Sequence, residues 1–127
     1  MAGLGGVAPI TFLLVPERDA ARAFYADKLG LTAVSEDDYA LVYDLDGTML
    51  RVSFVPDYVP HAHTVLGWRV DGIEAKVDEL KARGVEFLIY DGFGQDERGI
   101  WSAPGGGAKV AWFNDPFGNN LSLTEGG

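Results

Sequence analysis

The sequence contains no cysteine and only two histidines among its 127 residues. The absence of cysteine excludes disulfide bonds, thiolate nucleophiles, cysteine-ligated zinc and iron–sulfur clusters, and it is compatible with a reducing cytoplasm. A metal ion in this chain would depend on histidine and carboxylate ligands. Because His61 and His63 lie two residues apart, a histidine-rich catalytic site would need further histidines from a symmetric partner chain.

Basic residues are scarce as well, and long apolar runs are missing. The 10 Lys and Arg residues are outnumbered by 19 Asp and Glu residues, which gives a formal net charge of -9. Binding to a nucleic-acid backbone depends on clustered Lys and Arg, so this composition disfavours it. No apolar run approaches the roughly 18 residues of a membrane span, and residues 1–9 lack the basic start and apolar core of a secretory signal. We therefore expect a cytoplasmic protein that binds neither nucleic acid nor a membrane.

Apolar residues make up 47% of the chain, enough for the core of a single domain spanning residues 1–127. The first part predicts a strand, a helix and three strands. A β-branched run closed by Pro16 is typical of a strand, helical spacing up to Gly30 predicts a helix, and Asp46-Gly47 is typical of a hairpin turn. The expected elements are a strand at 10–15, a helix at 17–29, and strands at 31–34, 39–45 and 48–55.

The second part repeats this order after a break at residues 56–60. The expected elements are a strand at 64–70, a helix at 73–83, and strands at 85–90, 109–113 and 121–124. Val15 aligns with Val70, but Gly47 aligns with Gly118 at a larger offset, so the second part carries extra residues that must lie in 91–107. This glycine-rich segment is too long for an ordinary hairpin loop. It either covers a pocket, with Trp101 as an apolar cap, or forms an edge flap or a dimer contact.

Two copies of strand, helix and three strands resemble the vicinal oxygen chelate superfamily, which includes glyoxalase I, bleomycin-resistance proteins, fosfomycin-resistance enzymes and extradiol dioxygenases. The resemblance is carried by Phe24-Tyr25 and Leu29-Gly30-Leu31 in the first copy, and by Val70-Asp71 and Asp115-Pro-Phe-Gly-Asn119 in the second. It implies an α+β fold of two tandem βαβββ modules, residues 9–56 and 63–125, whose strands curl into a cup. It also implies a homodimer, since the superfamily commonly pairs modules between chains.

The resemblance further implies where a metal ion would be held. Metal-dependent members place one His or Glu on the first and last strand of each module, and the ion chelates two substrate oxygens as a Lewis acid. The matching positions here are Ile10, Arg51, Val65 and Ser122, and their neighbours in sequence include no His, Asp or Glu. Since these side chains do not suit a divalent cation, we expect no metal site and no cofactor, and we interpret His61 and His63 as a solvated pair.

Without metal ligands, the resemblance implies a cup used for binding, as in bleomycin-resistance proteins. Strand alternation places Phe12 beside Ile10, and Arg69 on the same side as Val65. The candidate ligand-binding residues are Arg51, Ile10, Phe12, Val65, Ser122, Arg69 and Trp101. They predict an apolar cleft with a positive spot at Arg51, suited to an aromatic or amphipathic small molecule that can carry an anionic group.

Two alternatives stay open. Arg51 is alternatively the ion-pair partner of a neighbouring carboxylate such as Asp44. The protein is alternatively a lyase, isomerase or dioxygenase of the same superfamily, either metal-free with Arg51 as an electrophile or with its metal ligands displaced. General acid–base catalysis needs a titratable group in the cup, and the expected lining supplies neither a carboxylate nor a histidine. No catalytic residue is therefore named.

Overall fold

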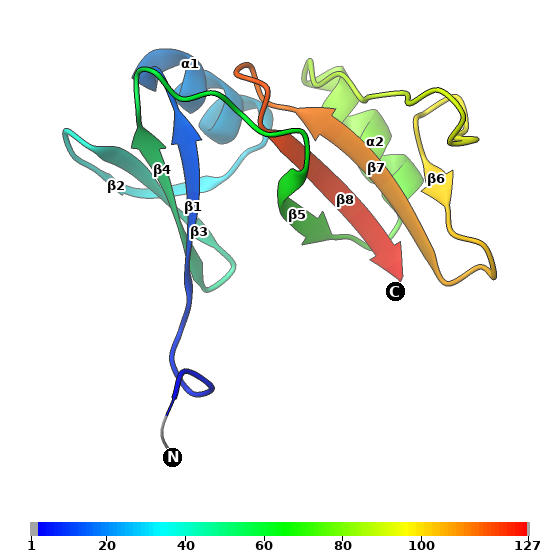
Figure 1. The fold of residues 1–127 in the computed structure, drawn as a ribbon, viewed down its shortest axis with the longest axis horizontal. Helices are drawn as coiled ribbons and strands as arrows, with labels where there is room; N and C mark the ends of the chain where they lie inside the picture. Colours follow the sequence, from blue (N-terminus) through cyan, green and yellow to red (C-terminus); the bar gives the residue numbers. More distant parts are fainter. Residues whose placement is uncertain (1–2, 127) are drawn as a thin grey trace. The chain divides into compact units, whose positions relative to one another are not determined.

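The computed structural model describes residues 3–126, which fall into two compact units that divide between Tyr58 and Val59 (Figure 1). Each unit contains one four-stranded sheet and the helix that follows its first strand. No helix within residues 3–126 is both long and apolar enough to cross a membrane.

The first unit has the element order strand, helix, three strands. Its elements are β1 (Ile10–Val15), α1 (Arg18–Arg22) continued by the π-helical segment η1 (Ala23–Lys28), β2 (Thr32–Glu36), β3 (Ala40–Leu45) and β4 (Thr48–Phe54). The sheet order is β1-β4-β3-β2, in which β1 runs parallel to β4 and the other neighbours are antiparallel. The four strands expected from the sequence are confirmed, with small shifts at their ends.

Local interactions explain the boundaries of these elements. Glu17 caps the start of the helix. Its carboxylate accepts hydrogen bonds from the backbone N–H groups of Asp19 and Ala20, which have no partner within the helix. The helix ends before Gly30, whose φ of 72° favours glycine. The hairpin between β3 and β4 turns at Asp46-Gly47, where both residues have positive φ, as a type I′ turn requires.

Strand alternation divides the first sheet into a buried face and an open face. The buried face packs under α1 and η1, and burying each large apolar side chain there contributes about 1.5–3 kcal/mol. This core consists of Leu13, Val15, Leu41, Tyr43, Leu50, Val52, Ala21, Phe24 and Tyr25. Phe12 and Arg51 are paired across β1 and β4 and project to the open face, away from the helix.

The second unit repeats the connectivity of the first. Its elements are β5 (Thr64–Arg69), α2 (Ile73–Ala82), β6 (Trp101–Ser102), β7 (Ala108–Asn114) and β8 (Asn120–Gly126). The sheet order is β5-β8-β7-β6, and β5 runs parallel to β8 as β1 does to β4. The expected α+β fold of two tandem βαβββ modules is therefore confirmed.

The prediction of a regular strand across residues 85–90 is wrong. Phe87 forms only an isolated bridge with Phe113, and the fourth strand of the sheet is β6, inside the segment expected to be a loop. The side chain of Gln95 explains the difference. Its Oε1 accepts from the Tyr90 N–H, and its Nε2 donates to the carbonyl of Leu88, so it satisfies backbone groups that a ladder would otherwise pair.

Candidate ligand-binding site

The second sheet has a buried face and an open face as well. The buried face and α2 form a core of Ala111, Phe113, Leu121, Leu123, Ile73, Val77 and Leu80. On the alternate positions, Trp112 lies opposite Ser122, which in turn lies opposite Gly67. Directly opposed residues project to the same side of a sheet. These three positions therefore belong to the face turned away from α2.

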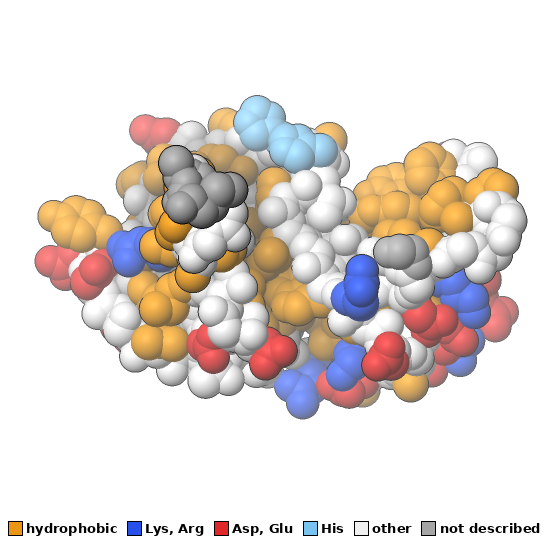
Figure 2. Space-filling model, turned by 90° about the horizontal axis from the view of Figure 1, so that it is seen from below, with side chains coloured by type: hydrophobic (Ala, Val, Ile, Leu, Met, Phe, Trp, Pro, Cys, Tyr) orange, Lys and Arg blue, Asp and Glu red, His pale blue; other side chains and the backbone are white. Residues whose placement is uncertain are grey.

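Four rings form an aromatic cluster at this face, namely those of Tyr90, Phe93, Trp101 and Trp112. The ring centroid of Trp112 lies 5.6 Å from that of Tyr90, 5.9 Å from that of Phe93 and 6.3 Å from that of Trp101. Tilted and edge-on pairs of this kind are favourable. Phe93 is 50% exposed, and Figure 2 shows hydrophobic side chains gathered at the right of the view, over the second unit. The aromatic cluster thus presents ring surface to solvent.

A chain of hydrogen bonds ends at the edge of the aromatic cluster. Thr64 Oγ1 donates to Asn120 Oδ1 (2.6 Å), and Asn120 Nδ2 donates to the Tyr90 hydroxyl (3.1 Å) and to Asn114 Oδ1 (3.2 Å). Asn120 is 4% exposed, so these partners set its orientation. Because an amide nitrogen only donates, the Tyr90 hydroxyl is the acceptor here and keeps its own proton. Within residues 3–126 no acceptor takes that proton, which leaves it available to a ligand.

Gly67 keeps the middle of this open face free of side-chain bulk. A Cβ atom at position 67 would lie 2.6 Å from Ser122 Oγ, a distance that real Cβ atoms essentially never show. Ser122 is itself buried. Its hydroxyl occupies the space that a larger residue at position 67 would need, so any such residue would have to turn the Ser122 side chain away.

The structure places the candidate residues of the second unit as follows. Arg69 lies opposite Thr124, and Trp101 lies opposite Val110. By strand alternation both residues belong to the open face. Val65 departs from the expected alternation, because a β-bulge shifts the register between Thr64 and Leu66. As a result Thr64, and not Val65, lies opposite Asn120.

The candidate residues of the first unit share the open face of the first sheet. Ile10 lies opposite Met49 and Phe12 lies opposite Arg51, and Phe12 is 60% exposed. Arg51 lies close to Asp37, with 3.9 Å between its Nη2 and the Asp37 Oδ2. This distance is long for a hydrogen-bonded ion pair.

The expected alternative partner of Arg51 is engaged elsewhere. Asp44 Oδ1 accepts a hydrogen bond from the backbone N–H of Gly47 in the β3–β4 turn. Within residues 3–126 the Arg51 guanidinium makes no hydrogen bond, and Asp37 is the carboxylate near it. A guanidinium in this state keeps its donors available for an anionic group.

The four positions at which the resemblance implies metal ligands do not fit a divalent cation. They hold two alkyl side chains, a guanidinium and a hydroxyl. Among residues 3–126 no three or more His, Asp or Glu side chains are grouped so that they could hold a metal ion. His61 and His63 stack with 5.6 Å between ring centroids, and Figure 2 shows them together on the surface.

Three members of the aromatic cluster and its polar partner fall outside the candidate set from the sequence. The face on which Trp112 lies follows from its pairing with Ser122 across β7 and β8. Alternation along β7 alone does not show which of its two faces is the open one. Phe93 lies in a loop without periodicity, and Tyr90 lies in the segment wrongly expected to be a strand. The usable signal was alternation along β8, which places Asn120 on the same side as Ser122.

Comparisons with known proteins agree with this architecture, although a search of curated proteins finds no match. A glyoxalase family protein from Enterococcus faecalis is similar with a TM-score of 0.70 and 20% identity, covering 93% of this chain and 94% of that one. Lactoylglutathione lyase from Agrobacterium tumefaciens is similar with a TM-score of 0.65 and 22% identity, covering 95% of this chain and 94% of that one. A genomically encoded fosfomycin resistance protein from Listeria monocytogenes is similar with a TM-score of 0.72 and 14% identity, covering 100% of this chain and 95% of that one.

At these identities the structural likeness shows the fold alone. The sequence model of the Glyoxalase/Bleomycin resistance protein/Dioxygenase superfamily, however, matches residues 6–123. Because this match spans nearly the whole sequence, the chain belongs to the Glyoxalase/Bleomycin resistance protein/Dioxygenase superfamily.

Proposed function

We propose that this protein binds a small aromatic or amphipathic molecule, and that the aromatic cluster on the open face of the second sheet is the main contact. The observation that carries the proposal is the hydroxyl of Tyr90 at the edge of that cluster, which accepts from buried Asn120 and has a proton to donate. An apolar surface with a few fixed polar groups is the usual composition of a small-molecule site.

The rings supply the apolar part of the site. Tyr90, Phe93, Trp101 and Trp112 are held by one another in tilted contacts, so their faces are ordered before a ligand arrives. Stacking between aromatic groups contributes about 0.5–1.5 kcal/mol beyond the buried area. Preorganised rings lose little conformational freedom on binding, which favours a planar ligand.

The Tyr90 hydroxyl defines the polar end of the ligand, beside the planar part that contacts the rings. Asn120 faces Tyr90 with its donor nitrogen, so the Tyr90 hydroxyl accepts there and still has its proton to donate. The matching ligand therefore carries an acceptor, such as a carbonyl or carboxylate oxygen, next to its planar apolar part. A ligand without an acceptor leaves this donor unpaired and binds more weakly.

Arg51 on the first sheet is proposed as a separate contact for an anionic small molecule, independent of the aromatic cluster. Its neighbour Phe12 is largely exposed, and its distance from Asp37 leaves the guanidinium without a hydrogen bond among residues 3–126. Charge-assisted hydrogen bonds to a carboxylate are about twice as strong as neutral ones. We also propose that the protein is a homodimer, because large apolar side chains are exposed on this face.

Three related probes test the proposal by isothermal titration calorimetry. Naphthalene has no acceptor, acetonaphthone has a neutral acceptor, and naphthoate has an anionic one. We expect acetonaphthone to bind more tightly than naphthalene, by roughly two- to tenfold, and naphthoate to bind more tightly still. Tyr90→Phe should remove the preference for both acceptor-bearing probes at the aromatic cluster. Arg51→Ala should remove a separate naphthoate-binding step at the first sheet and leave the binding of the other two probes unchanged.

Tyr39→Phe is the matched control, because it removes a hydroxyl from an exposed tyrosine of the first unit. It should leave all three affinities unchanged. The proposal is overturned if none of the probes binds, or if Tyr90→Phe and Tyr39→Phe behave alike. Conversion of a bound probe into product would instead favour the enzymatic alternative.

A further inference from the structure

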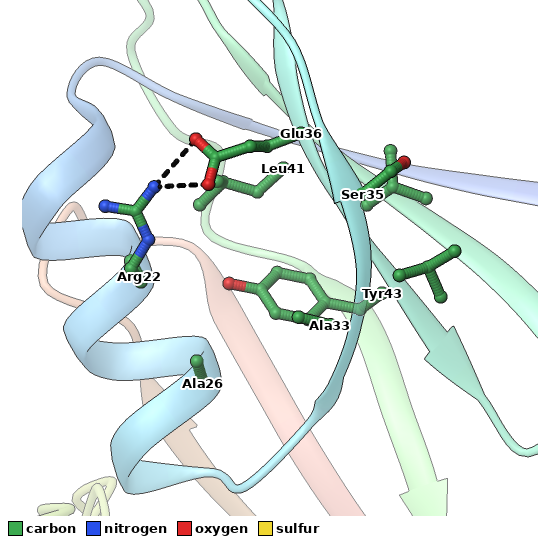
Figure 3. Close-up of a pocket in the computed structure, with 9 residues that line it drawn as sticks. Arg22, Ala26, Ala33, Ser35, Glu36, Leu41 and Tyr43 are labelled. Carbon is green, nitrogen blue, oxygen red and sulfur yellow. Dashed lines mark hydrogen bonds and ion pairs between the residues drawn. The ribbon is translucent and has the colours of Figure 1, made fainter.

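A pocket of about 220 Å³ lies on the other side of the first sheet from Arg51, between the helix and strand β2 (Figure 3). The residues that line it are Arg22, Ala26, Ala33, Val34, Ser35, Glu36, Leu41, Val42 and Tyr43. Ala33 lies opposite Tyr43 across β2 and β3, so both project to the helix side of the sheet. Ala33 and Tyr43 therefore place the pocket beside the helix, apart from the open face of the same sheet that carries Phe12 and Arg51.

Small side chains explain why this space is not filled. Ala26 on the helix and Ala33 on β2 both end at Cβ, and Figure 3 shows Ala26 projecting from the helix toward the strand. The helix fills the rest of its interface with Phe24 and Tyr25, which are buried. Its last part is π-helical, with the N–H of Leu29 bonded to the carbonyl of Phe24, and π-helical turns occur frequently at functional sites.

The Tyr43 hydroxyl is the polar group of the pocket. Tyr43 is 2% exposed, and Figure 3 shows its hydroxyl pointing from β3 toward the helix, on the side of Arg22. No residue within 3–126 forms a hydrogen bond with this hydroxyl. A molecule that fills the pocket displaces the water around this hydroxyl, so a molecule that offers it a hydrogen-bonding partner binds more tightly than one that does not.

The rim of the pocket has balanced charge. Arg22 Nη2 donates to both carboxylate oxygens of Glu36, at 2.9 and 2.8 Å, and Arg18 Nη1 donates to the same carboxylate at 2.6 Å. Asp19 lies 3.6 Å from Arg22. The two charged residues that line the pocket, Arg22 and Glu36, are thus paired with each other, so the lining itself carries no net charge to attract an ion.

Tyr43 stays protonated at neutral pH. Burial is the main reason that the pKa of its hydroxyl is raised above the ordinary value; the Arg22 guanidinium acts against this, and the carboxylates of Asp27 and Glu36 act with it. The hydroxyl is therefore able both to donate and to accept a hydrogen bond inside the pocket.

We propose that this pocket is a second binding site, which takes a small neutral molecule with an apolar body and one hydrogen-bonding group, of which phenol is the simplest example. The size is sufficient, since an engineered cavity of about 150 Å³ holds benzene. The apolar body contacts Ala26, Ala33 and Leu41, and the polar group pairs with the Tyr43 hydroxyl.

Titration of the ¹⁵N-labelled protein with phenol and with toluene tests this site by nuclear magnetic resonance. We expect phenol to shift the amide resonances of residues 33–36 and of Arg22 and Ala26. It should bind roughly two- to tenfold more tightly than toluene, which has no hydrogen-bonding group. Tyr43→Phe should abolish the preference for phenol while leaving toluene binding in place.

Ala26→Leu should abolish the phenol shifts by filling the pocket, whereas Ala23→Leu, an equal change at an exposed position of the same helix, should not. Ala33→Leu fills the pocket from the strand side and keeps the test decisive if the helix variant does not fold. The proposal is wrong if the shifts lie elsewhere, or if the Ala26 and Ala33 variants bind phenol as the wild type does.

Discussion

At the scale of single residues, Asp37 shows how backbone donors set the charge state of a side chain. Its Oδ1 accepts hydrogen bonds from the backbone N–H groups of Tyr39 and Ala40, at 2.8 and 2.9 Å. These bonds are the main reason that the pKa of Asp37 lies below its ordinary value, and the guanidinium groups of Arg51 and Arg18 act in the same direction. The ionised carboxylate thereby stabilises the turn between β2 and β3.

Acidification is expected to weaken this turn. The pKa of Asp37 is lower in the folded chain than the ordinary value of 3.8. Its contribution to the free energy of unfolding is therefore fully present above that pH and is lost as the pH falls through the pKa of the folded chain. Asp37→Asn keeps an oxygen acceptor but not the titration. Urea unfolding across the acidic range should therefore show a shallower loss of stability for this variant than for the wild type. Asp57→Asn, between β4 and β5, removes a carboxylate that makes no hydrogen bond or ion pair within residues 3–126 and should follow the wild type. An identical pH profile for Asp37→Asn would contradict the role given to Asp37.

At the scale of elements, the β7–β8 turn positions the polar end of the proposed site. The buried Asp115 accepts from the backbone N–H groups of Phe117 and Asn119 with Oδ1, and from the Asn119 side chain with Oδ2. Asn119 is followed by Asn120, which begins β8 and donates a hydrogen bond to the Tyr90 hydroxyl. The turn is therefore coupled to the site through the start of one strand.

Asp115→Ala leaves these donors unpaired in a buried turn. We expect it to lower the free energy of unfolding by about 1–3 kcal/mol, measured by urea denaturation. Asp44→Ala provides the comparison, because that carboxylate is exposed and accepts from one backbone N–H in the β3–β4 turn. It should cost about 0.5–1 kcal/mol. Equal losses for the two variants would show that burial of the Asp115 network adds nothing.

At the scale of the whole molecule, apolar exposure bears on assembly. The open face of the first sheet exposes Ile10, Phe12 and Met49, although the chain as a whole is strongly acidic. Acidic charge keeps surfaces apart in solution, whereas a contiguous apolar patch favours contact with another surface. The proposed homodimer would cover such side chains.

Light scattering coupled to size exclusion should give about twice the chain mass of 13.7 kDa. Met49→Asp should shift the protein toward the monomer, because it introduces a charge into the apolar patch. Leu4→Asp is the matched control, since Leu4 is exposed but lies outside both sheets. A monomeric wild type, or the same shift in both variants, would refute the dimer.

Much of the fold could be predicted because it depends on local chemistry. The apolar run before Pro16, the stop at Gly30 and the Asp46-Gly47 turn each act within a few neighbouring residues, and their repetition predicted the second module. The candidate site was harder to predict. The Gln95 side chain replaces a strand with a loop, and a bulge changes the alternation near Val65, and neither feature has a periodic signature.

The sequence by itself determined the order of the elements and the apolar character of the implied metal positions, because both depend on residue type and spacing along the chain. Only the tertiary structure decided that Tyr90 meets Trp112 and Asn120, that Arg51 lies near Asp37, and that Ala26 and Ala33 leave a pocket beside Tyr43. The reason is physical: strand register and helix packing determine which distant side chains meet, and what fills the space between them depends on the size of both partners.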